Sequence, residues 1–235
     1  MSESKIQTFN HLKIHSQYSI CEGALKIDDL KDFSKENKVK SLALCDTINL
    51  CGALEFAEKI SKVGTQPIIG TQINFKINDT IGLLPLFALN EEGYKRIIEL
   101  SSSSYLDNDQ SLGSYLDFNQ LLKKSEGVAI FSGTINGLFG QLFDKGKFTE
   151  INDLYSKLKL VYGDRFYIEI QRHGDQNEIP FEKFNLSHSL KLEVPLIATN
   201  EVYYINKNMH EAHDALICIK NKTYVNEKNR IRFSN

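Results

Sequence analysis

The sequence predicts a single α/β domain built as a (βα) barrel. Two observations support this prediction: short apolar runs alternate with longer amphipathic stretches along nearly the whole chain, and no linker-like break divides it. Strands that alternate with helices of such lengths are typical of βα units and of a mainly parallel sheet. About seven units can be counted, which favours a closed barrel over the alternative of an open doubly wound sheet.

Strands are predicted where short apolar runs lie between polar turn residues. A period of two residues along such a run places alternate side chains on one face of the sheet. In chain order the predicted strands are His11–His15, Ser41–Cys45, Pro67–Ile77, Leu83–Leu89, Val128–Phe131, Phe166–Ile170 and Pro195–Thr199.

Helices are predicted between these strands, where apolar residues recur every three or four positions. The stretch Ile27–Glu36 has its apolar residues on one face, and Leu50–Val63 ends before Gly64, a residue suited to the C-terminal cap. The polar stretch Tyr105–Ser125 is predicted to be a long loop or excursion. The further predicted helices are Glu91–Leu100, Phe148–Tyr162, Glu178–Leu192 and Asn208–Ile219.

Composition and charge exclude several classes of protein. The chain is 41% apolar and 25% charged, as soluble globular proteins are, and its net charge of -2 gives no general attraction to nucleic acid. No apolar run approaches the ~20 residues of a membrane span, and the polar N-terminus has no signal-peptide core. The cysteines fit no zinc-binding pattern, so we expect reduced thiols in a cytoplasmic protein that does not bind membranes.

The C-terminal stretch differs from the rest of the chain in its charge. Its basic residues are opposed only by Glu227, and it carries no capping or stopping signal. We interpret it as a solvated face or a linker, and the chain as a segment of a longer polypeptide. The alternative is a DNA-binding segment, whose affinity would fall steeply with salt. The basic residues are Lys220, Lys222, Lys228, Arg230 and Arg232.

Polar residues follow the carboxyl ends of the predicted strands, which is where the functional side chains of (βα) barrels lie. The first strand carries Lys13 and His15 on one face and runs on to Glu22. Every later strand except the fourth is also followed by polar side chains, so we predict a polar, concave mouth. The later polar segments are Asp46–Thr47, Gly70–Gln72, Ser132–Thr134, Gln171–Gly174 and Asn200–Tyr203.

In their order and their residues, these segments resemble the polymerase-and-histidinol-phosphatase (PHP) domain at the N-terminus of bacterial DNA polymerase III alpha subunits. The resemblance covers nearly the whole chain and is weakest across Tyr105–Ser125. It implies a distorted (βα)7 barrel, similar to a TIM barrel, and a single PHP domain over residues 1–235 of a longer polymerase polypeptide. The segments that carry it are Phe9–Gly23, Asp46–Gly52, Pro67–Gln72, Leu89–Tyr94, Phe166–Gly174, Ala198–Tyr204, Glu211–Ile219 and Asn229–Phe233.

Active members of that family hold metal ions and hydrolyse phosphoester bonds. The resemblance assigns ten positions of this chain to the family's ligand pattern, called here the ligand positions. Acceptable donors stand at His15, Glu22, Asp46, His173 and Glu201. The family's usual ligands are replaced at Lys13, Thr47, Gln72, Thr134 and Tyr203.

This donor set predicts a mouth without a metal ion. A lysine ammonium has no lone pair, and glutamine, threonine and neutral tyrosine are poor ligands for zinc or manganese. Converging carboxylates would repel one another without a cation, and the Lys13 ammonium can supply that charge. We therefore expect an ion-pair network, no cofactor and no catalytic residue in this segment. The expected network consists of Lys13, Glu22, Asp46 and Glu201.

Several polar residues also have purely structural explanations. Asp46 fits the N-cap of the helix that starts near Leu50, and Glu22 fits a turn. His213 and Asp214 are predicted to lie on a packed helix, because apolar residues recur around them at helical spacing.

The leading hypothesis is a scaffold and docking module of a replicative polymerase's catalytic subunit. The resemblance implies two partners, the rest of the alpha subunit and a separate proofreading exonuclease subunit, with DNA bound through other domains. The chain itself contains no phosphate-binding loop and no polymerase active site. The alternative is a metal-dependent phosphoesterase or 3'-5' proofreading nuclease with altered ligands, which would use zinc or manganese.

Overall fold

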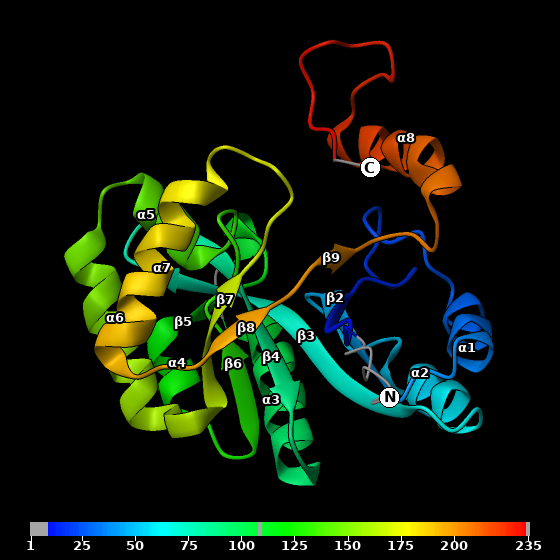
Figure 1. Cartoon of the computed structure of the whole chain (residues 1–235). Helices are drawn as coiled ribbons and strands as arrows, with labels where there is room; N and C mark the ends of the chain where they lie inside the picture. Colours follow the sequence, from blue (N-terminus) through cyan, green and yellow to red (C-terminus); the bar gives the residue numbers. More distant parts are fainter. Residues whose placement is uncertain (1–8, 108–109, 234–235) are drawn as a thin grey trace, which may run out of the picture.

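The chain folds into a curled β-sheet flanked by helices (Figure 1). The computed structural model describes residues 9–107 and 110–233. The strands are β1 (Lys13–Ile14), β2 (Ser41–Thr47), β3 (Gln66–Ile77), β4 (Thr80–Ala88), β5 (Leu116–Asp117), β6 (Val128–Phe131), β7 (Phe166–Ile170), β8 (Leu196–Ala198) and β9 (Glu201–Val202). The helices are α1 (Ile27–Glu36), α2 (Ala53–Ser61), α3 (Glu91–Leu106), α4 (Phe118–Lys123), α5 (Leu138–Asp144), α6 (Phe148–Tyr162), α7 (Glu178–Leu192) and α8 (His210–Asn221).

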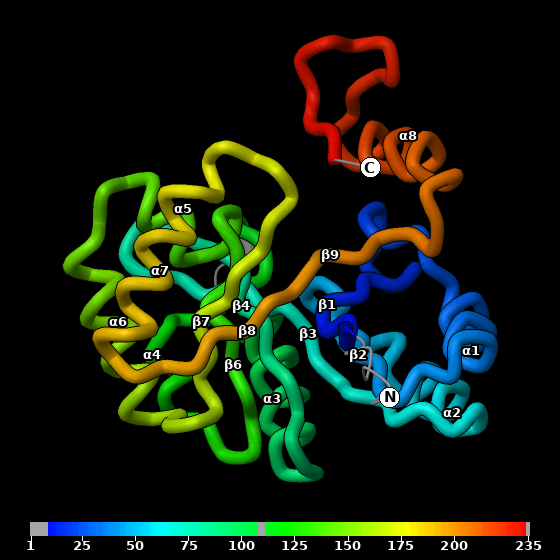
Figure 2. The backbone as a smooth tube through the Cα atoms, viewed as in Figure 1, coloured from blue at the N-terminus to red at the C-terminus, as the bar shows by residue number. Residues whose placement is uncertain are grey.

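The strands form one curled sheet and a separate two-stranded pair. Neighbours follow the order β2-β3-β4-β6-β7-β8, while β1 and β9 form a parallel pair of their own. This pair lies beside both ends of the larger sheet, because β9 follows β8 almost directly in the chain and the amide of Ala43 in β2 donates to the carbonyl of His11, 3.1 Å away. The tube view shows β1, β2 and β9 side by side (Figure 2).

Strand β4 departs from the predicted βα alternation. It follows β3 through a turn at Asn78 and Asp79 and pairs with β3 and β6 in antiparallel register. A parallel connection needs a crossover of a dozen or more residues, so this short turn forces the reversal. The expectation of a mainly parallel sheet holds for the pairs β2·β3, β6·β7, β7·β8 and β1·β9.

Most predicted elements are present with similar bounds. The predicted bounds of α1, α6, α7, β6 and β7 are those observed. The predicted excursion at Tyr105–Ser125 contains the end of α3, a 3-10 turn, β5 and the whole of α4, so the expectation of a long loop is only partly met. Its residues 108 and 109 lie outside the described part of the chain. The short helix α5 was not predicted, since one turn or two give too few apolar residues to establish a period.

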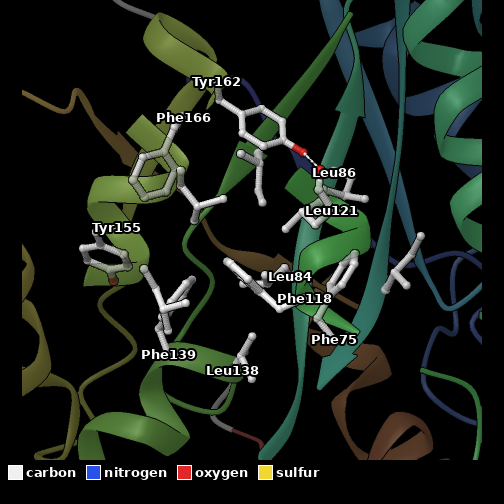
Figure 3. Packing of buried hydrophobic residues seen from close by; sticks show 14 of the residues in the cluster. Phe75, Leu84, Leu86, Phe118, Leu121, Leu138, Phe139, Tyr155, Tyr162 and Phe166 are labelled. Carbon is white, nitrogen blue, oxygen red and sulfur yellow. Dashed lines mark hydrogen bonds between the residues drawn. The ribbon is translucent and has the colours of Figure 1, made fainter. Parts of the chain in front are cut away.

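The main hydrophobic core lies between the sheet and helices α3 to α7 (Figure 3). Phe139 is buried in this core, with its ring centroid 4.7 Å from that of Tyr155 and 6.3 Å from that of Phe118. The hydroxyl of Tyr162 donates to the carbonyl of Leu121, 2.9 Å away, so this buried polar group has a partner. Aromatic packing of this kind holds the helices at fixed positions on the sheet.

A smaller cluster packs α1 and α2 against β1 and β2. Ile14, Leu30, Leu44 and Phe56 are buried in it, and they fix strand β1, which carries Lys13 and is followed directly by His15. Within the described residues, no helix is both long enough and apolar enough to span a bilayer.

Replacing Phe139 by alanine should destabilise the fold by about 3–5 kcal/mol, because the change leaves a cavity between packed aromatic rings. Urea unfolding monitored by circular dichroism measures this difference. Leu160→Ala is the matched control, since Leu160 lies on α6 with 86% of its surface exposed and should cost little. Equal midpoints for the two variants would contradict the described core.

Candidate functional site

Strands β1, β7 and β9 bring three charged side chains together at the candidate site. The parallel pairing of β1 with β9 places Lys13 opposite Glu201, and the two side chains form an ion pair. Lys13 Nζ also lies 3.2 Å from Glu169 Oε1 of β7. The side chains of Lys13 and Glu169 are fully buried, so this is a charged cluster inside the protein.

The opposite charges in this cluster attract one another, and this attraction offsets the free-energy cost of burying them. Burial by itself disfavours the ammonium of Lys13, but the attraction of Glu169 and Glu201 outweighs it, so the pKa of Lys13 lies above its usual range. Burial likewise opposes ionisation of Glu201, yet Lys13 and His15 hold the pKa of that carboxyl well below its usual range. Both shifts favour the charged forms, so the site holds a stable ion pair at neutral pH.

Glu169 is a member of this cluster that the sequence reasoning missed. Its Oε1 accepts hydrogen bonds from Thr199 Oγ1 and from Gln171 Nε2, the latter at 3.0 Å. Its Oε2 is buried and has no hydrogen-bond partner among the residues that the structure describes. Glu169 and Thr134 both line a small cavity of about 20 Å³. The signal was present in the sequence, since Glu169 is the one charged residue in the otherwise uncharged strand Phe166–Ile170.

His15 lies beside the ion pair and extends the polar cluster. Its Nε2 contacts Glu201 Oε2, and its Nδ1 lies 3.4 Å from Thr47 Oγ1. Gln72 Nε2 is 3.3 Å from His15 Nε2 and 3.5 Å from Glu201 Oε2. The imidazole stacks on the ring of Tyr203, with 4.6 Å between ring centroids. Four ligand positions therefore surround His15, joined by hydrogen bonds and stacking.

Asp46 is held by serine residues. Its Oδ1 accepts from the Ser16 amide and from Ser19 Oγ, both at 2.7 Å, and Ser16 Oγ donates to Oδ2 at 2.8 Å. Burial raises the pKa of Asp46, although these hydrogen bonds oppose that shift. Asp46 does not cap α2 as suggested by the sequence, because the N-cap residue of that helix is Gly52.

Glu22 faces the C-terminal helix. Its Oε1 pairs with Lys220 of α8, and its Oε2 accepts a hydrogen bond of 2.6 Å from Thr47 Oγ1. Its backbone carbonyl lies 2.8 Å from His213 Nε2, which places a second residue of α8 against the same turn. His213 and Asp214 are buried on that helix, as predicted.

His173 contacts α7 through two bonds. Its Nδ1 and its backbone amide each lie 2.8 Å from the carboxylate of Glu178. The neighbouring Arg172 forms a bidentate pair with Glu182, also on α7, at 2.9 and 2.6 Å. These bonds attach the loop after β7 to the helix that follows it.

The structure thus groups the polar residues differently from the expected network. Lys13 and Glu201 are together, with Glu169 as a further partner, while Glu22 pairs with Lys220 and Asp46 is bound by Ser16 and Ser19. Among the residues that the structure describes, no three histidine, cysteine, aspartate or glutamate side chains are grouped so that they could hold a metal ion.

The sequence is similar to several bacterial polymerase subunits. It is 36% identical to the DNA polymerase III subunit alpha of Caulobacter vibrioides over 99% of this chain, and 37% identical to that of Rickettsia felis over 90%. The corresponding protein of Borreliella burgdorferi is 34% identical over 95%. The chain spans about a fifth of the length of these relatives, with 21%, 18% and 20% of each covered.

Two solved structures share the fold. One is a two-domain protein from Bacteroides vulgatus described as containing a predicted PHP-like metal-dependent phosphoesterase, with a TM-score of 0.52, 14% identity, and 83% of this chain and 51% of that one covered. The other is an amidohydrolase from Chromobacterium violaceum, with a TM-score of 0.52, 11% identity, and 89% and 97% covered. These likenesses confirm the predicted distorted barrel.

The profile of the PHP domain matches residues 11–173, which include β1 to β7 and therefore Lys13, His15 and Glu169. The match covers well over half of the chain and agrees with the curled sheet and with the order of its strands. The chain belongs to the PHP domain family.

Proposed function

We propose that this chain is the PHP domain of a replicative DNA polymerase III alpha subunit and serves there as a scaffold and docking module. The observation that carries the proposal is the buried ammonium of Lys13 between Glu169 and Glu201. A positive charge at that place balances carboxylates that would otherwise require a metal ion. The similarity to polymerase alpha subunits over nearly the whole chain supports the assignment to that protein.

The residues at the ligand positions do not suit a metal ion. Lys13 Nζ has no lone pair, and both of its carboxylate partners keep it protonated. Around His15 stand Thr47, Gln72 and Tyr203, whose neutral oxygen and amide groups are poor ligands for zinc or manganese. No hydrolytic step is therefore assigned to this pocket.

The docking role needs an accessible surface, and the buried part of the mouth does not provide one. Lys13, His15 and Asp46 are at most 1% exposed, and Gln72 is 6% exposed. A partner protein would bind the outer helices and loops of the barrel, while the buried ion pair keeps the barrel rigid beneath them. We propose the proofreading exonuclease subunit as that partner, with DNA bound by other parts of the polymerase.

Replacing Lys13 by methionine should destabilise the chain by about 3–5 kcal/mol, because Glu169 and Glu201 would remain buried without a cation. Urea unfolding at neutral pH measures the loss. Lys59→Met is the matched control, since Lys59 pairs with Asp28 and Glu55 at the surface and its replacement should cost much less stability.

A triple variant separates charge from packing. Adding Glu169→Gln and Glu201→Gln to Lys13→Met removes the buried like charges and should recover much of the lost stability. A Lys13→Met variant as stable as the wild type would show that the ammonium does not balance these carboxylates.

The purified chain should contain only substoichiometric zinc, manganese or iron after dialysis against a chelator, because the ligand positions lack donors for a multinuclear site. It should not hydrolyse a chromogenic phosphodiester when manganese is added. Elemental analysis and the hydrolysis assay check the two outcomes. Tightly held metal together with manganese-dependent hydrolysis would support the phosphoesterase or nuclease alternative.

The immobilised chain should retain the exonuclease subunit encoded by the same genome. Gln72→Ala should retain it equally, because this residue of the mouth is too buried to contact a partner. A pull-down with purified exonuclease measures both. If the exonuclease passes over the wild-type chain unbound, the docking role is wrong.

A further inference from the structure

A cavity of about 660 Å³ opens between the turn that joins β3 to β4, the start of α4 and the start of α6. Sites for small organic ligands have volumes of about 300–1,000 Å³, so this cavity is large enough for one. None of the described residues that line it stands at a ligand position. The roles given above to the residues of the mouth therefore do not account for it.

Lysine side chains supply positive charge to this cavity. Lys147 directly precedes α6, Lys157 lies within that helix, and Lys76 belongs to β3. Another lysine of α6, Lys159, pairs with Asp164 at 3.7 Å, whereas no ion pair among the described residues includes Lys147 or Lys157. Both of these residues are exposed, so their ammonium groups are available to an anion that enters from solvent.

The carboxylates that line the cavity can accept hydrogen bonds from a ligand. Asp117 Oδ1 already accepts one of 2.8 Å from the Asn119 amide at the start of α4, and Glu150 Oε1 accepts one of 2.8 Å from Asn78 Nδ2. The carboxylate of Asp153 takes part in no hydrogen bond or ion pair with the other described residues. A ligand that fits this lining therefore carries an anionic group for the lysines and N–H or O–H donors for a carboxylate.

An aromatic ring adds a flat apolar surface to the lining. Phe148 lines the cavity and is 48% exposed. Its ring packs against those of Phe143 and Phe184, with centroid separations of 5.2 and 5.8 Å, and these contacts hold its orientation. A held, half-exposed ring of this kind can stack on the face of a nucleobase.

We propose that this cavity binds a nucleotide. Lys147 and Lys157 contact its phosphate, Phe148 packs against its base, and Asp153 accepts a hydrogen bond from a sugar hydroxyl or a base amino group. An inorganic anion lacks the ring and the donors, and a free nucleoside lacks the charge, so neither matches the whole lining. The inference goes beyond the scaffold and docking role, which requires no small ligand.

Photo-crosslinking of the purified chain with 8-azido-dATP tests this proposal. The probe should label the tryptic peptide of residues 148–157, which contains Phe148 and ends at Lys157. Mass spectrometry of the digest locates the label. Unlabelled dATP should compete with the probe, whereas deoxyadenosine and inorganic phosphate at the same concentration should compete much less, because each supplies only part of the contacts.

Changing Lys147 and Lys157 together to methionine should raise the Kd for dATP at least about tenfold, because charge-assisted contacts to the phosphate are lost. Equilibrium dialysis measures the Kd. Lys183→Met is the matched control, since Lys183 is an exposed lysine of α7 that does not line the cavity. The altered residues are all exposed, so the urea midpoints should stay close to that of the wild type and a change in Kd reports binding.

Other outcomes would overturn the proposal. These are equal Kd values for the wild type and the double lysine variant, labelling confined to peptides that carry the ligand positions, and competition by inorganic phosphate as strong as that by dATP. A parallel dialysis with dAMP identifies the number of phosphates, and tighter binding of either nucleotide supports the proposal. The Lys13→Met variant does not alter this cavity, so the scaffold role and the nucleotide site can fail separately.

Discussion

The buried contact of Lys13 with Glu169 and Glu201 is the constraint on which the rest of the site depends. Three strands that are distant in the sequence must converge for these charges to meet, and each charge is costly in the interior without the others. The pairing of β1 with β9 meets this requirement by placing Lys13 opposite Glu201. The closure of the barrel and the charge balance of its mouth are therefore coupled.

The residues at the ligand positions have distinct structural roles in this chain. Lys13 and Glu201 form the buried pair, Asp46 is held by serine hydroxyls, and His173 attaches a loop to α7. Glu22 connects the barrel to α8 through Lys220. Each residue has a specific partner in the folded chain, and each of those partners belongs to a different element. In this chain the residues at these positions therefore form contacts between elements.

The sequence predicts most of the fold because the apolar periodicity of a helix or strand depends only on residues close together in the chain. The bounds of α6 and β7, for example, follow from this periodicity. The direction of β4 was not predicted, since it depends on a short turn at Asn78 that resembles an ordinary break between strands. At the site, the sequence identifies Lys13, because this residue stands at one of the ligand positions. Glu169 stands out as the one charged residue of its strand, but its partner Lys13 lies on a strand that is distant in the sequence, and the sequence alone does not show that the two meet.

The Lys13 cluster also limits which substitutions this pocket could accept during evolution. A histidine at position 13 would bring a lone pair but would remove the permanent cation beside Glu169 and Glu201. Thr47 and Gln72 would still lack strong donors, so that intermediate would have lost stability before it gained a metal. If residues change one at a time, this chain would therefore reach a metal site only through less stable intermediates.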